Sequence, residues 1–294
     1  MKGMTSRYLV CLGREIHLTE WAAPGLAPDA PVLVAWHGLA RSGRDFDVLA
    51  RQLCDRWRVI CPDTVGRGLS QWAEDPAAEY HLGAYVALAE SLLDQLGLTQ
   101  CDWLGTSMGG AIGLLGAATR LQGRIRRLVL NDIGPEIEAA AVARIRTYAG
   151  APPAFATVTE LEAYFREIYA SFGVLTDAQW RQLTETSLRR LPDGRVTPHY
   201  DPRIVQQFER ATDDYLLWDA WDRLRLPVLC LRGADSSLLS ATTAEAMRTR
   251  GPLAELITVP GCGHAPALNT AEQIGWVERF LSASEIGLLG GVQR

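Results

Sequence analysis

The chain has 294 residues and 48% of them are hydrophobic, as in ordinary soluble globular proteins. This length suits one large domain, or a core that carries an inserted subdomain. The net charge of −5, without a long run of like charges, argues against nucleic acid or an anionic membrane as the main partner. Because no window holds 18 uninterrupted apolar residues, we expect no membrane span.

Six cysteines are scattered along the chain, and none forms a C-x-x-C pair. This usage is typical of buried thiols in a reducing compartment. The first ten residues lack the apolar stretch of a secretory signal. We therefore expect a cytoplasmic protein. Since no two histidines have ligand spacing, we also expect no metal, and we expect no cofactor.

The first half of the chain alternates between short apolar runs and segments with helical spacing. The runs predict buried strands at 31–36, 58–61, 101–105 and 127–130, and the spacing predicts helices at 45–53 and 82–96. Such alternation is typical of a mostly parallel twisted sheet flanked by helices. The sites of these sheets lie at the carboxyl ends of the strands, where His37, Ser107 and Asp132 stand.

The pattern changes between residues 134 and 225, where helical periods replace the alternation. This segment holds 12 of the 23 aromatic residues. We expect a helical cap, or lid, whose aromatic residues either cover an apolar pocket or form a small core of their own. Alternation resumes after it, with strands at 226–231 and 255–259 and helices at 242–249 and 270–281. The predicted core is therefore 1–133 and 226–294, with the cap at 134–225.

The stretch 103–111 has the pattern G-x-S-x-G, centred on Ser107. An apolar run precedes it and a run of small residues follows it, which is typical of a nucleophile elbow between a strand and a helix. A serine hydroxyl needs a histidine that accepts its proton and a carboxylate that orients the histidine. Asp235 and His264 follow the last two predicted strands, so we expect Ser107, Asp235 and His264 to form a catalytic triad. The backbone N–H groups of Met108 and Leu39 are expected to form the oxyanion hole.

These features together resemble the α/β-hydrolase fold superfamily, with a helical cap inserted after the sixth strand. The chain looks most like single-cap bacterial serine carboxylesterases, several of which accept polyesters or other acyl esters. The resemblance implies that His37 and Gly38 support the oxyanion loop. It also leaves Asp132 open as an alternative acid, because some members carry the acid after the sixth strand. The loop 63–70 departs from the family pattern, since Val65 replaces an arginine.

The leading prediction is a cofactor-independent esterase that acts on a small-molecule ester through an acyl-enzyme. One alternative is a carbon–carbon bond hydrolase that uses the same triad. A second is a ligand receptor that keeps the hydrolase scaffold and turns over slowly. Acyl-chain length, lactone or polymer preference and oligomeric state are not predicted by the sequence.

Overall fold

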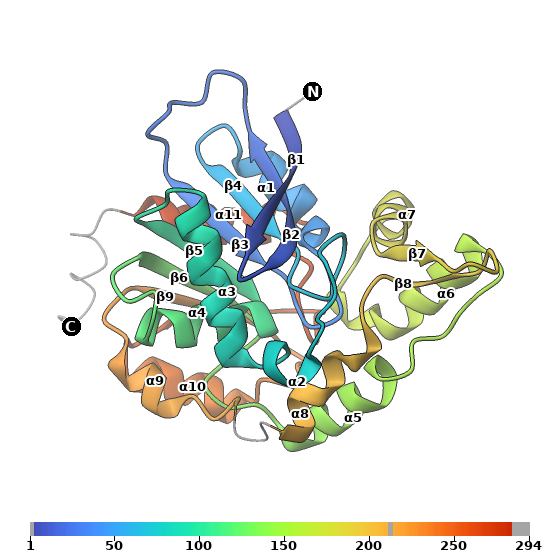
Figure 1. Cartoon of the computed structure of the whole chain (residues 1–294). Helices are drawn as coiled ribbons and strands as arrows, with labels where there is room; N and C mark the ends of the chain where they lie inside the picture. Colours follow the sequence, from blue (N-terminus) through green and yellow to red (C-terminus); the bar gives the residue numbers. More distant parts are fainter. Residues whose placement is uncertain (1–2, 211–213, 284–294) are drawn as a thin grey trace.

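The computed structural model describes residues 3–210 and 214–283. An eight-stranded sheet runs through the molecule in the order β1-β2-β4-β3-β5-β6-β9-β10 (Figure 1). β1 and β2 form an antiparallel hairpin, and β2 pairs antiparallel with β4. All the other pairs of neighbouring strands, from β4 to β10 in this order, are parallel. The strands are β1 Gly3–Cys11, β2 Arg14–Ala22, β3 Val32–Trp36, β4 Arg58–Pro62, β5 Cys101–Thr106, β6 Ile125–Asn131, β9 Val228–Gly233 and β10 Glu255–Val259.

Helices cover both faces of the sheet, which explains why the central strands are continuous apolar runs. On one face, the short 3-10 helix η1 (Gly43–Phe46), α1 (Asp47–Leu53) and α11 (Ala271–Ser282) pack against the sheet in one hydrophobic cluster. Helices of the second, larger cluster are α3 Leu82–Gln95, α4 Met108–Ala118, α9 Trp218–Arg223 and α10 Ala241–Thr249. A single turn, α2 (Pro76–Glu79), precedes α3.

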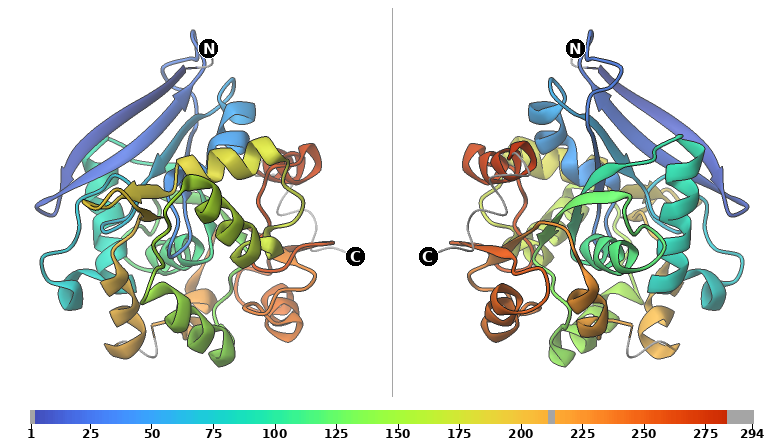
Figure 2. Two further views of the ribbon diagram at one scale, coloured as in Figure 1. Left: turned by 90° about the vertical axis from the view of Figure 1, so that its right-hand side faces the viewer. Right: turned by 90° about the vertical axis from the view of Figure 1, so that its left-hand side faces the viewer.

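The segment between β6 and β9 forms a group of small elements beside the sheet, and this group faces the viewer in the left panel of Figure 2. It contains a hydrophobic cluster of its own, built around Leu161, Phe165 and Trp180. Other residues of the segment, including Ile145, Phe208 and Trp221, pack into the larger core cluster. The elements are α5 Ala139–Ala149, α6 Val158–Ile168, η2 Ala170–Phe172, α7 Asp177–Glu185, β7 Leu188–Arg190, β8 Val196–Pro198, η3 Pro202–Gln206 and α8 Gln207–Arg210.

Ser107 lies at a sharp turn between β5 and α4. Its backbone has φ 53° and ψ −119°, a conformation that costs energy for a residue with a side chain. Neighbouring glycines allow this turn to stay tight, since a Cβ on Gly105 would collide with the backbone of Gly109. A Cβ on Gly109 would in turn collide with the carbonyl oxygen of Trp36. Small residues therefore let α4 approach β5 and β3 closely.

We predict that Gly109→Ala lowers the free energy of unfolding by about 2–3 kcal/mol, because the new methyl group meets backbone that cannot move aside. Gly275→Ala is a matched control inside α11, where the added Cβ would meet only the end of the flexible Arg279 side chain at 3.4 Å. This control should gain up to about 1 kcal/mol from higher helix propensity. Equilibrium denaturant unfolding measures both, and a Gly109→Ala protein as stable as the wild type would contradict the packing argument.

Candidate active site

Ser107 and His264 are joined by a hydrogen bond of 2.9 Å between Oγ and Nε2. Ser107 is presented by the turn before α4, and His264 stands in the loop after β10. They are 157 residues apart in the sequence, and the parallel sheet brings them together because both follow carboxyl ends of strands. A histidine in this position can accept the serine proton and so activate the hydroxyl for attack.

The carboxylate that contacts His264 belongs to Asp132, whose Oδ2 lies 2.6 Å from the imidazole Nδ1. This corrects the expectation that Asp235 would orient the histidine. Asp235 is exposed in the turn after β9, and its backbone N–H donates to the carbonyl of Cys262. Asp132, which the sequence analysis left open as the alternative acid, is fully buried behind His264.

The pairing of neighbouring strands explains why Asp132, and not Asp235, contacts His264. β6 and β9 are paired in parallel, so residues that follow them reach the same region beside His264. Asp132 accepts hydrogen bonds from the backbone N–H of Gly233 at 2.8 Å and from the hydroxyl of Ser236 at 2.6 Å. Ser236 thus stands one residue after the expected acid and supports the carboxylate from the loop that follows β9. A carboxylate held by these donors can fix the tautomer of His264 with the proton on Nδ1.

His37 supports the oxyanion loop from a fully buried position. Its Nε2 accepts a hydrogen bond from the backbone N–H of Thr64 at 2.9 Å, so the proton lies on Nδ1 and is donated to the carbonyl of Gly38 at 2.6 Å. Burial is the main cause that lowers the pKa of His37 to about 4, and the imidazole stays neutral. Because the C=O and N–H of a trans peptide point in opposite directions, the N–H of Leu39 is directed away from His37.

Leu39 and Met108 remain the proposed oxyanion donors. Neither backbone N–H makes a backbone hydrogen bond within residues 3–210 and 214–283. Met108 begins α4, where N–H groups have no partner inside the helix. Gly38 lies beside the nucleophile, since a Cβ added to it would stand 3.6 Å from Cβ of Ser107. The two donors therefore flank the serine from two separate segments of the chain.

Arg67 is a supporting residue that the sequence analysis missed. Its guanidinium is fully buried and donates to the carbonyl of Leu39 at 2.8 Å and to the carbonyl of Val65 at 2.8 Å. It also reaches Sδ of Met108 at 3.5 Å. One side chain thus braces both proposed oxyanion segments. The sequence feature that could have indicated this role is the position of Arg67 between two glycines in the loop 63–70.

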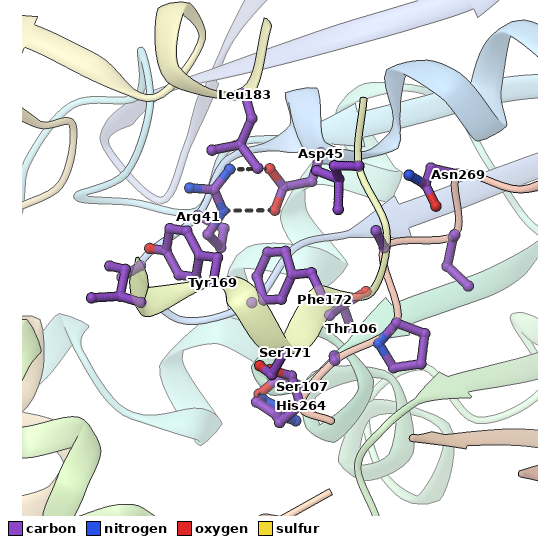
Figure 3. A pocket seen from close by; sticks show the side chains of 18 of the residues that line it. Arg41, Asp45, Thr106, Ser107, Tyr169, Ser171, Phe172, Leu183, His264 and Asn269 are labelled. Atoms are coloured by element: carbon purple, nitrogen blue, oxygen red, sulfur yellow. Dashed lines mark hydrogen bonds and ion pairs between the residues drawn. The ribbon is translucent and has the colours of Figure 1, made fainter. Parts of the chain in front are cut away.

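A cavity of about 230 Å³ opens above the serine and reaches the segment between β6 and β9, which is called the cap after the sequence prediction (Figure 3). Ser107 and His264 lie at one side of it in this view, and Arg41 and Asp45 lie at the other. Its wall combines apolar and polar side chains, which suits a ligand that carries both methyl groups and oxygen atoms. Lining residues from the cap include Ile145, Ile168, Tyr169, Ser171, Phe172, Leu175, Gln179, Gln182 and Leu183.

The cap is hydrogen-bonded directly to the loop that carries His264. The hydroxyl of Ser171 donates to the carbonyl of His264 at 2.7 Å, and the backbone N–H of Gly263 donates to the carbonyl of Ser171 at 2.7 Å. The N–H of Ala267 adds a bond to the carbonyl of Phe172 at 3.0 Å. The short η2 helix therefore belongs to the framework that positions the histidine.

Among the residues that the structure describes, no group of three His, Cys, Asp or Glu side chains could hold a metal ion. All six cysteines are buried, and none is in a disulfide. No helix in the described parts of the chain is long and apolar enough to cross a membrane.

We predict that Asp132→Asn lowers kcat by roughly 10³–10⁴-fold, since an amide cannot hold His264 in the required tautomer. Asp235→Asn is the matched control on the adjacent strand end and should change kcat by less than about threefold. Steady-state hydrolysis of p-nitrophenyl butyrate by the two purified variants measures this. A larger loss of kcat in Asp235→Asn than in Asp132→Asn would show that Asp235, which follows β9, is the acid of the triad.

We also predict that His37 makes stability depend on pH. Its pKa is about 4 when folded and near 6.5 when unfolded, so the unfolded chain binds more protons between these values. The contribution is therefore complete above pH 6.5 and is lost as the pH falls toward 4, with a limit of about 3 kcal/mol. In denaturant unfolding at several pH values, the stability advantage of wild type over His37→Asn should shrink across this window. An advantage that is constant with pH would refute the assignment.

The chain is similar to known hydrolases. The alpha/beta hydrolase family model matches residues 32–274. A 3-hydroxybutyrate-oligomer hydrolase of Cupriavidus necator is 40% identical over 274 residues, which cover 90% of this chain and 92% of the relative. A pimeloyl-[acyl-carrier protein] methyl ester esterase of Xanthomonas oryzae is 26% identical and covers 86% of this chain and 96% of its own.

The crystal structure of an alpha/beta hydrolase from Novosphingobium aromaticivorans superimposes with a TM-score of 0.86 and 35% identity. The alignment covers 96% of this chain and 99% of that one. The expected fold class, a mostly parallel sheet flanked by helices, is confirmed by this match and by the sheet itself. The chain belongs to the alpha/beta hydrolase family.

Proposed function

We propose that this carboxylic ester hydrolase cleaves short oligomers of 3-hydroxybutyrate or closely related hydroxyacids through an acyl-enzyme on Ser107. The observation that carries the proposal is the hydrogen-bonded chain from Ser107 through His264 to Asp132, which opens into the capped cavity. The relative with 40% identity over nearly its whole length supports the substrate class. The other curated relative described above also acts on an ester.

The reaction begins when Oγ of Ser107 bonds to the ester carbonyl carbon and its proton passes to Nε2 of His264. The carbonyl oxygen becomes an oxyanion next to the N–H groups of Leu39 and Met108. The C–O bond to the alcohol then breaks, and His264 returns its proton to the leaving oxygen. Water then attacks the acyl-enzyme and gives a proton to His264. The bond between the acyl carbon and Oγ breaks, the acid leaves, and His264 returns this proton to Oγ of Ser107. Asp132 stabilises the imidazolium formed in both halves.

The cavity suits a small substrate. Its volume of about 230 Å³ is below the range of about 300–1,000 Å³ for pockets that hold drug-sized ligands. Phe172, Leu183 and Leu268 supply apolar walls, and Asn269 and Gln182 supply polar groups. A hydroxyacid oligomer presents a methyl group and an ester group in every unit, so it matches this mixed lining. The cap boundaries of 134–225 and a cytoplasmic location remain part of the proposal, and the buried cysteines support a reducing compartment.

We predict that the wild type releases 3-hydroxybutyrate from its linear dimer and trimer, and that Ser107→Ala reduces the rate by at least about 10⁴-fold because the nucleophile is lost. Chromatographic detection of the monomer measures the reaction, and unfolding curves verify that the variant is folded. Hydrolysis of p-nitrophenyl butyrate without any hydrolysis of the dimer would leave an esterase with a different substrate. Dimer hydrolysis that survives in Ser107→Ala would overturn the acyl-enzyme mechanism.

A further inference from the structure

Arg41 is a charged side chain inside the cavity that the ester-cleaving step does not use. It follows the oxyanion loop by two residues and is only 7% exposed. Both Arg41 and Ser107 line the cavity. Burying a guanidinium is costly unless its N–H groups are paired, so this placement calls for partners on every side.

Asp45 pairs with only one edge of this guanidinium. Nε of Arg41 donates to Oδ2 of Asp45 at 2.9 Å, and Nη2 donates to Oδ1 (Figure 3). Nη1 is buried and makes no hydrogen bond to any residue that the structure describes. Apart from Asp45, the guanidinium interacts with the hydroxyl of Tyr169, and Nη1 keeps donor capacity for a further acceptor.

Aromatic rings hold the guanidinium in place. Its central carbon lies 4.7 Å from the ring centre of Tyr169 and 5.9 Å from that of Phe165, both in the cap. Burial raises the pKa of the Tyr169 hydroxyl, which stays protonated beside the cation. Asp45 and the two rings thus restrict the orientation of Arg41, so little conformational entropy is lost when a ligand binds.

The stem of Arg41 starts beside the reacting centre, although its guanidinium lies across the cavity from Ser107. A Cβ on Gly38 would lie 3.6 Å from Cβ of Ser107 and 3.9 Å from Cγ of Arg41. The stem of the arginine and the nucleophile therefore flank the same glycine. A group attached a few bonds from the scissile ester can approach the guanidinium while the ester carbonyl stands at Ser107.

Resting on the proposed function, we propose that Nη1 of Arg41 binds the free carboxylate of the oligomer on the alcohol side of the scissile bond. A carboxylate one hydroxyacid unit beyond the ester is the acceptor that such a substrate brings, and charge-assisted bonds from guanidinium to carboxylate are strong. The cavity then selects the carboxyl terminus of the oligomer. Each turnover releases one hydroxyacid monomer from that end.

Two other arginines line the cavity and serve as comparisons. Arg44 uses Nε and Nη2 on Asp47, and its side chain is 29% exposed. Arg144 is exposed on α5 and donates to the hydroxyl of Ser237 at 2.7 Å. Arg144 is the competing site for a carboxylate, because it carries no carboxylate partner in the described part of the chain. It therefore provides the matched control variant.

The first experiment compares kcat/KM for the 3-hydroxybutyrate dimer and for its methyl ester, which lacks the negative charge. The wild type should favour the free acid by about tenfold or more, and Arg41→Gln should abolish the preference. The ratio is taken within each protein, so it does not depend on the fraction folded. Arg144→Gln should keep the preference. Equal rates for acid and ester in the wild type, or loss of the preference in Arg144→Gln instead, would overturn the proposal.

The second experiment does not require oligomer hydrolysis. Inhibition of p-nitrophenyl butyrate turnover is measured with 3-hydroxybutyrate and with methyl 3-hydroxybutyrate. The wild type should be inhibited more strongly by the acid, and Arg41→Gln should lose this difference. Arg41→Lys, which keeps the charge opposite Asp45, replaces Arg41→Gln if that variant does not fold, and it should also weaken acid binding because one ammonium replaces the guanidinium fork. If the wild type does not cleave the dimer but shows this selectivity, the proposed function fails and the carboxylate site stands. Equal inhibition by acid and ester in the wild type refutes the site.

Discussion

The positive φ of Ser107 is the constraint on which the rest of this molecule depends. A residue with a side chain accepts that backbone only where its surroundings hold it there. The surroundings here are a helix and two strands packed so closely that Gly105 and Gly109 have no space for a Cβ. The same close packing places Gly38 beside the nucleophile and aligns the start of α4 with the oxyanion loop. The strained backbone of Ser107 therefore depends on the missing side chains of Gly105 and Gly109.

Polar groups that must be buried near this turn are satisfied by one another. His37 connects the backbone of Thr64 to the carbonyl of Gly38, and Arg67 connects the carbonyl of Leu39 to Met108. These bonds rigidify loops that would otherwise move, and a preorganised site loses less energy to rearrangement during the reaction. The neutral state of His37 is a consequence of that burial. Stability at neutral pH and the geometry of the site therefore share a physical origin.

The cap contributes to both ends of the site. Its η2 helix holds the loop of His264 through Ser171 and Phe172, while Tyr169 packs against Arg41 at the far side of the cavity. A change in cap packing would thus affect the histidine and the ligand pocket together. The aromatic residues of this segment serve both roles considered from the sequence, since some form a small core and others line the cavity.

Local sequence was sufficient for the features that depend on chain neighbours: the alternation of strands and helices, the elbow at Ser107, and the strand-end positions of His264 and Asp132. It favoured Asp235 as the acid, because position after a strand cannot reveal which of two adjacent strand ends faces the histidine. Pairing of β6 with β9 decided that choice by placing Asp132 against His264 and Ser236 behind it. The local sequence likewise did not predict the roles of Arg67 and Arg41. They arise from contacts between segments far apart in the chain, which only the packed tertiary structure brings together.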